Sequence, residues 1–210
     1  MISKKTRRGL VKADRRFAYL VEICGDIDVP LREAHFESLI SSIIGQQLSG
    51  KVATVIWQRL VTFLKKRVTP KNVMAADTEA LRGLGISYKK VEYIKNIAGA
   101  VLDKSLDLDN LAKYSDEEII EQLTRIKGVG RWTAEMFLIF SLGREDVYSL
   151  GDGGLTRAVR NLYGMEKEPT KAQLAEISSR WSPYRTAASL YLWRSLDRDI
   201  AACIEGRKIK

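Results

Sequence analysis

Asp152 is the acidic residue of this sequence whose position best suits a role in chemistry. It stands between Leu150-Gly151 and Gly153-Gly154, at the predicted start of a helix. There, backbone N–H groups hold a carboxylate in place and the helix dipole favours its charge. A carboxylate fixed in this way can stabilise positive charge that develops during a reaction. The alternative is a purely structural helix cap, and the two roles are compatible.

A glycine-rich turn upstream of Asp152 is the second candidate feature, because Ile126-Lys127-Gly128-Val129-Gly130 lies between two helical patterns. Glycine permits positive φ and leaves backbone N–H groups uncovered. Uncovered N–H groups at a helix start bind anions, and phosphate is the natural anion for a basic protein. The predicted phosphate contacts are Lys127, Gly128, Gly130 and Arg131. The alternative is a plain corner between helices that binds nothing.

The composition favours a nucleic-acid partner. The chain has 210 residues, with 35 Lys and Arg against 26 Asp and Glu, a formal charge of +9. Such an excess indicates a polyanion, nucleic acid ahead of a membrane surface, although simple solubility also explains it. Cys24 and Cys203 are too far apart to form a metal-spaced cluster, so we expect no iron–sulfur cluster. The sequence lacks a membrane-length apolar run and a secretory signal, which predicts an intracellular protein.

The elements that must position these residues are predicted to be helices. Apolar residues recur at helical spacing along almost the whole chain, and no segment alternates in the manner of a strand. Ser115 and Glu118 have capping-box spacing. Ser49 can cap a helix whose expected core face is Val52, Val55, Ile56 and Leu60. About ten short helices with short connections predict an all-α fold.

Three motifs in this sequence resemble one family. Residues 123–134 resemble the helix-hairpin-helix motif of the DNA glycosylase superfamily that carries a downstream catalytic aspartate. Within it, Gly130-Arg131-Trp132-Thr133-Ala134 is similar to the alkylation-repair branch, the 3-methyladenine DNA glycosylase II family. Residues 36–49 and 181–194 also resemble that family, and the resemblance covers roughly residues 30–200. We expect a short form, without the N-terminal β-rich domain of longer bacterial members.

The resemblance implies two helical lobes with the active-site cleft between them. Residues 33–145 would form a central bundle ending in the hairpin, and residues 1–32 with 146–210 the second lobe. Asp152 matches the family's catalytic aspartate. Gly151 replaces the first of two successive acids common in the family, and the usual preceding proline is absent, which predicts a looser loop. Glu145 and Asp146, earlier in this loop, read as solvated charge.

The resemblance also implies contacts that grip and open DNA. Gln47 matches the residue that fills the gap left by a flipped base, with Leu48 as the second choice; a buried turn is the alternative. Ser87 and Lys90 resemble a second contact to the DNA backbone, although a solvated helix start explains them equally well. Some relatives hold a monovalent cation, Na⁺ or K⁺, at the hairpin, here on the main-chain carbonyls of Thr124, Ile126 and Val129.

Aromatic residues are the candidates for a base pocket. An alkylated purine carries positive charge, which electron-rich rings attract. We expect Trp132, Tyr184 and Trp193 to line the pocket, with Met136 where some members have tyrosine; core packing is the alternative, above all for Trp193. Trp132 also stands where glycosylases that cut the strand place a nucleophilic lysine. The sequence therefore predicts a monofunctional enzyme in which water is the nucleophile.

The leading hypothesis is a monomeric enzyme that excises bases such as 3-methyladenine or 7-methylguanine from duplex DNA, with no required cofactor. It would work in the cytoplasm or nucleoid of a prokaryote, or in a nucleus. One alternative is a helix-hairpin-helix module that binds DNA without catalysis. Another is a glycosylase for mismatched or otherwise damaged bases. Binding alone needs the hairpin, whereas chemistry needs Asp152.

Overall fold

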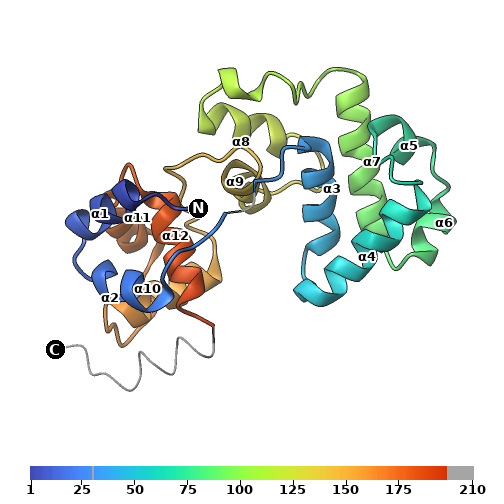
Figure 1. The fold of residues 1–210 in the computed structure, drawn as a ribbon. Helices are drawn as coiled ribbons and strands as arrows, with labels where there is room; N and C mark the ends of the chain where they lie inside the picture. Colours follow the sequence, from blue (N-terminus) through green and yellow to red (C-terminus); the bar gives the residue numbers. More distant parts are fainter. Residues whose placement is uncertain (30, 198–210) are drawn as a thin grey trace. The chain divides into compact units, whose positions relative to one another are not determined.

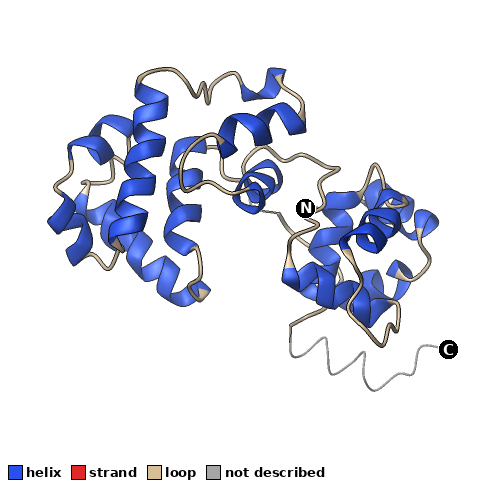
Figure 2. Cartoon of the chain, turned by 180° about the vertical axis from the view of Figure 1, so that it is seen from behind, coloured by secondary structure: helices blue, strands red, loops and turns tan. Residues whose placement is uncertain are grey.

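The computed structural model describes residues 1–29 and 31–197, and within these ranges the chain is helical with no strands (Figures 1 and 2). The predicted all-α class is therefore confirmed. The chain divides into two compact units, residues 31–142 and residues 1–30 with 143–210. Cys203 lies outside the described residues. No helix of the described part is long and apolar enough to cross a membrane.

The unit of residues 31–142 is built around α7, which packs against α3, α5 and α6 (Figure 1). Helix α8 packs against α9, and α3 packs against both α4 and α9. The core of this unit is aliphatic, with Leu39, Ile40, Ile94 and Leu123 fully buried. Its helices are α3 (His35–Gly45), α4 (Gly50–Phe63), α5 (Pro70–Ala75), α6 (Thr78–Gly83), α7 (Tyr88–Leu102), the 3-10 helix η1 (Leu111–Lys113), α8 (Asp116–Thr124) and α9 (Arg131–Phe140).

Local capping signals begin several of these helices. Ser49 caps α4 by accepting from the Val52 N–H, and Ser115 and Glu118 form the predicted capping box of α8. The expected core face of α4 is wrong in part, because Val52 and Val55 are 46% and 47% exposed. Helical spacing identifies the apolar stripe of α4, but packing covers only its later turns, where Ile56 and Leu60 are buried.

The second unit is built around α12, which packs against α1, α2 and α10. Its fully buried side chains include Ala188, Ser189, Tyr191 and Leu192. The helices of this unit are α1 (Lys4–Ala13), α2 (Phe17–Cys24), α10 (Gly153–Leu162), α11 (Lys171–Ser179) and α12 (Arg185–Arg194). The first helices of the chain therefore share a core with its last ones.

A buried polar anchor joins the two ends of the chain in this unit. The carboxylate of Asp14, only 8% exposed, accepts hydrogen bonds from the Tyr163 hydroxyl, the Trp181 indole and the backbone of Arg16. Burial acts to raise the pKa of Asp14, but these hydrogen bonds outweigh it and the pKa is lowered. Trp181 also packs edge-on against Phe17. The anchor fixes the turn between α1 and α2 against the helices that follow Asp152.

Candidate active site

Asp152 is held by two donors that converge on one oxygen. It is the N-cap of α10, as predicted, and its Oδ1 accepts from the Leu155 N–H at 2.7 Å and from the Trp193 Nε1–H at 3.1 Å. The side chain is nearly buried, at 9% exposure. The two donors and the N-cap position at α10 hold the side chain in one orientation. The site therefore presents a carboxyl group in a fixed position.

Gly154 makes room for the bond between Trp193 and Asp152. A Cβ at this position would lie 3.0 Å from Asp152 Oδ1 and 3.4 Å from Trp193 Cδ1. A Cβ on the neighbouring Gly153 would meet nothing within 4 Å. The close approach of the indole thus favours glycine at the second of these two positions, because a Cβ there would be in tight contact with both groups. Sequence reasoning missed this role, although the pair of glycines after the acid was the signal.

Hydrogen bonds connect the loop before Asp152 to α12 and to the residues just before that helix. The Arg185 guanidinium donates to both carboxylate oxygens of Asp146, at 2.8 and 3.0 Å, and the Ser182 hydroxyl donates to the same group at 2.7 Å. The Thr186 hydroxyl accepts from the Val147 N–H at 3.0 Å. The loop that lacks the family's proline is therefore tied to the helix that carries Trp193.

The reading of Asp146 as solvated charge is wrong. Burial acts to raise its pKa, but the hydrogen bonds from Arg185 and Ser182 outweigh burial and the pKa is lowered. These partners lie far away in the sequence, so the local pattern of residues could not reveal the pair.

Tyr184, a predicted base-pocket residue, begins α12 and packs against α1. A Cβ on Gly9 would lie 2.3 Å from the Cζ atom of its ring, so glycine is needed for this contact. Half-buried in this position, Tyr184 contributes to the packing of its unit. A stacking role for it stays a prediction.

The hairpin between α8 and α9 is shaped by Gly128. This residue has φ of 105°, and a Cβ on it would lie 2.1 Å from the Tyr93 ring, so only glycine fits. The Val129 N–H closes the turn on the Ile126 carbonyl at 3.0 Å. Helix α9 then begins at Arg131, and its N-cap residue, Gly130, provides no side-chain hydrogen bond. The first turn of α9 therefore offers backbone N–H groups for an anion.

The basic side chains of the hairpin are paired with carboxylates. Lys127 Nζ lies 2.6 Å from Glu92 Oε1, and Glu92 raises the pKa of Lys127 through this bond. Arg131 donates to both oxygens of Glu117, at 2.7 and 2.9 Å, and to Glu135 at 3.0 Å. All of these bonds except that to Glu135 join exposed side chains, where ion pairs are weak. A phosphate can displace them, so the phosphate contacts of Lys127 and Arg131 stay predictions.

Two other predicted site residues lie on α9. Trp132, in the first turn beside the hairpin, is 44% exposed, and Met136 is buried one turn later. An exposed tryptophan ring at a helix start is available to a ligand, whereas Met136 contributes to the core of its unit. Because Trp132 and Met136 belong to one unit and Tyr184 and Trp193 to the other, their meeting in one pocket stays a prediction.

The turn between α3 and α4 holds the predicted wedge. Gln47 and Leu48 are both exposed. The backbone of Gln47 has φ of 57°, a left-handed conformation that residues other than glycine rarely adopt. Ser87 caps α7 by accepting from the Lys90 N–H, and the Lys90 ammonium donates to the carbonyls of α3. The structure therefore gives Ser87 and Lys90 roles inside the protein, and their contact with DNA stays a prediction.

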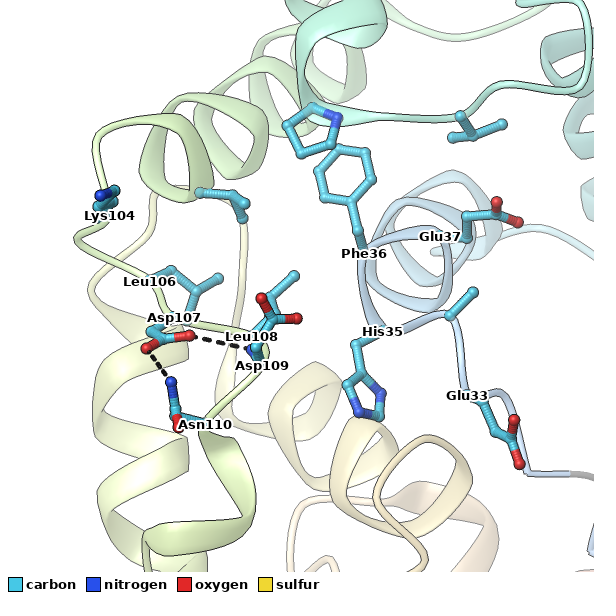
Figure 3. Close-up of a pocket in the computed structure, with 14 residues that line it drawn as sticks. Glu33, His35, Phe36, Glu37, Lys104, Leu106, Asp107, Leu108, Asp109 and Asn110 are labelled. Atoms are coloured by element: carbon cyan, nitrogen blue, oxygen red, sulfur yellow. Dashed lines mark hydrogen bonds between the residues drawn. The ribbon is translucent and has the colours of Figure 1, made fainter.

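A cavity of about 710 Å³ in the unit of residues 31–142 contains none of the predicted site residues (Figure 3). Carboxylates dominate its charge: Glu33, Glu37, Asp107 and Asp109 line it together with Lys104. Such a lining repels phosphate. This cavity is therefore not the surface that the hairpin and the wedge would present to DNA.

The comparison with known families identifies the class of protein. The model of the HhH-GPD superfamily of base excision DNA repair proteins matches residues 40–183. The chain belongs to this superfamily. The match runs from α3 through the hairpin and Asp152 to Pro183, shortly before α12 begins at Arg185.

Two relatives of this chain carry names from the alkylation-repair branch of the superfamily. DNA-3-methyladenine glycosylase 1 of Schizosaccharomyces pombe is 39% identical over 163 residues, covering 76% of this chain and 72% of the relative. The alkylbase DNA glycosidase-like protein mag2 of the same organism is 32% identical over 197 residues, covering 91% of this chain and 92% of that protein.

Solved structures agree with these relatives. The crystal structure of DNA-3-methyladenine glycosidase from Bacillus halodurans superposes with a TM-score of 0.83 at 39% identity, covering 93% of this chain and 91% of that one. The 3-methyladenine DNA glycosylase of S. pombe in complex with abasic DNA gives a TM-score of 0.83 at 35% identity, covering 91% of this chain and 96% of that one. The sequence-based assignment to a DNA glycosylase family is confirmed.

The two hairpin glycines should respond differently to substitution. Gly128→Ala introduces a Cβ into the Tyr93 ring at positive φ, so we expect it to lower the free energy of unfolding by about 2 kcal/mol or more. Gly130→Ala has open space and φ of −89°, so it should cost no more than about 1 kcal/mol, the usual penalty for alanine at an N-cap. Urea unfolding of both variants measures this. Equal stability of the two would contradict the assigned role of Gly128.

Proposed function

We propose that this protein is a DNA glycosylase that hydrolyses the N-glycosidic bond of alkylated bases, of the 3-methyladenine and 7-methylguanine type, in duplex DNA for base excision repair. The observation that carries the proposal is the Asp152 carboxylate, held on Oδ1 by the Leu155 N–H and the Trp193 indole. The 3-methyladenine glycosylases among its relatives support the choice of lesion.

DNA binding would rest on main-chain groups. The uncapped first turn of α9, after Gly128 and Gly130, supplies N–H donors for a phosphate. Such contacts grip the backbone of DNA and carry no sequence information, which suits an enzyme that must search any sequence. The net charge of +9 strengthens this grip.

The target base must leave the stack before it can react. Unstacking costs a few kcal/mol, and an inserted side chain can fill the gap. The exposed Gln47, at the tip of its turn, is our candidate for this wedge, with Leu48 beside it. The flipped base would stack on Trp132, Tyr184 or Trp193, because a cationic alkylated purine is attracted to electron-rich rings by about 0.5–2 kcal/mol each.

The chemical step would use Asp152 as a fixed negative charge. As the bond to the alkylated base breaks, positive charge builds on the sugar, and the carboxylate stabilises it electrostatically. The electron pair of the broken bond leaves with the base, whose alkylation already makes it a good leaving group. Water adds to the sugar carbon and loses a proton, so the products are a free base and an abasic site.

We also propose that the hairpin binds a monovalent cation. Main-chain carbonyl oxygens are hard donors suited to Na⁺ or K⁺. The Ile126 carbonyl, which accepts from the Val129 N–H, keeps a second lone pair. We propose that it acts with the carbonyls of Thr124 and Val129 when the ion is bound, and that the ion adds positive charge beside the phosphate. We further propose that the enzyme acts as a monomer.

Asp152→Asn tests the catalytic assignment. The amide keeps the shape of the side chain but removes its charge, so we expect base release from methylated duplex DNA to fall by about a hundredfold or more. Affinity for an abasic-analogue duplex should persist, because the hairpin supplies it. Free-base release and binding are measured on the same protein preparations.

The same experiment separates the rival functions. If the protein only binds DNA, neither the wild type nor the Asp152→Asn variant will release a base. A glycosylase for mismatched or oxidised bases would leave methylated DNA intact and act elsewhere in a panel of lesion duplexes. Equal release by wild type and variant would contradict the role of Asp152.

The tryptophan at position 132 predicts the absence of lyase activity. Without an amine there, no Schiff base forms with the sugar, so the strand should stay intact after base release. Reaction products are run on a denaturing gel with and without alkali, and a parallel sample receives borohydride. Strand cleavage without alkali, or a protein–DNA adduct trapped by borohydride, would overturn the prediction.

A further inference from the structure

One face of α7 supports both parts of the surface that would contact DNA. Lys90, Tyr93 and Asn96 recur every three residues along this helix. Lys90 bonds to the turn that bears Gln47, the ring of Tyr93 packs on Gly128, and Asn96 Nδ2 donates to the Lys127 carbonyl at 3.3 Å. The wedge turn and the hairpin are thus attached to one rigid helix.

Lys90 makes the closest of these contacts. Its Nζ donates to the carbonyl of Ile44 at 2.7 Å and to that of Gln46 at 2.8 Å. These carbonyls lie at the C-terminal end of α3, where a helix leaves carbonyl groups without intrahelical partners and a cation is favoured. The ammonium therefore closes the end of α3 immediately before Gln47.

Gln46 ties the same turn directly to the hairpin. Its side-chain Nε2 donates to the Gly128 carbonyl and to the Thr133 hydroxyl, each at 3.3 Å. The backbone of Gln46 is held by Lys90, while its side chain is held by the hairpin and α9. Gln47, the next residue, points its side chain outward from a left-handed backbone that needs such support.

We propose that Lys90 is a positioning residue for the wedge: its ammonium, bound to the Ile44 and Gln46 carbonyls, fixes the turn that presents Gln47 to DNA. The proposal rests on the wedge role of Gln47 in the proposed function. It assigns Gln46 the matching role of setting the distance between wedge and hairpin.

The environment of Lys90 separates this role from a phosphate contact. Burial lowers the pKa of Lys90, as expected for an ammonium directed into the protein. The adjacent Lys89 is exposed and has the same charge. A phosphate contact would release counterions when DNA binds, whereas an internal brace would not. Lys89 therefore provides a matched control for the loss of one positive charge.

The test compares Lys90→Met, Gln46→Ala, Gln47→Ala and Lys89→Met with wild type. Each protein binds a duplex that contains an abasic-site analogue beside 2-aminopurine, whose fluorescence rises when the base unstacks. The salt dependence of affinity is measured on the same duplex, and urea unfolding verifies that each variant is folded. Gln46→Ala tests the second support of the same turn, the side-chain bonds to the hairpin and α9, without a change of charge. Lys90→Gln, whose shorter neutral side chain also lacks the ammonium, replaces Lys90→Met if that variant fails to fold, with the same expected result.

We expect Lys90→Met and Gln46→Ala to lose the fluorescence rise as Gln47→Ala does, with the slope of log affinity against log salt unchanged. Lys89→Met should keep the rise. A fluorescence rise in Lys90→Met equal to that of wild type, with the salt slope unchanged, would overturn the proposal and show that Lys90 has no role in positioning the wedge. A retained rise with a salt slope reduced by about 1 would also overturn it and would indicate a phosphate contact. A Gln47→Ala protein that keeps the full rise would remove the wedge role itself, and the proposal with it.

Discussion

The candidate active site depends on holding one nearly buried carboxylate in a fixed position. The Leu155 N–H in the first turn of α10 and the indole N–H of Trp193 both donate to Asp152 Oδ1. Gly154 makes the arrangement possible, since a side chain there would crowd the oxygen and the indole.

The positioning of this carboxylate depends on distant parts of the chain. The loop before it is tied to α12 by Asp146 and Arg185, and α12 packs against the first helices of the chain, which Asp14 anchors. In the other unit, α7 carries the supports of the hairpin and of the wedge turn. Each unit thus contains a helix that supports one part of the proposed function: α12 supports the candidate catalytic carboxylate, and α7 supports the proposed contacts to DNA.

The helix caps and the hairpin turn were predictable from the local sequence. The N-caps Asp152, Ser115 and Ser49 bond to residues within one helical turn, so the local sequence predicts them. The glycines of the hairpin likewise indicate a tight turn at their own positions. The contacts of Asp146 and Lys90 were not predictable, because their partners are 39 and up to 46 residues away in the chain. The prediction that Val52 belongs to the core failed for the same reason. Residue spacing defines an apolar stripe on a helix, but tertiary packing decides which turns of that stripe are covered.

Trp193→Phe tests the central claim most directly, because it keeps an aromatic ring and removes the indole N–H that donates to Asp152 Oδ1. The measurement is the single-turnover rate of base release from methylated duplex DNA at saturating enzyme, beside affinity for an abasic-analogue duplex. A hydrogen bond to a charged group is worth about 1.5–3 kcal/mol, so the rate should fall about tenfold to a hundredfold while affinity stays unchanged. A wild-type rate would contradict the account.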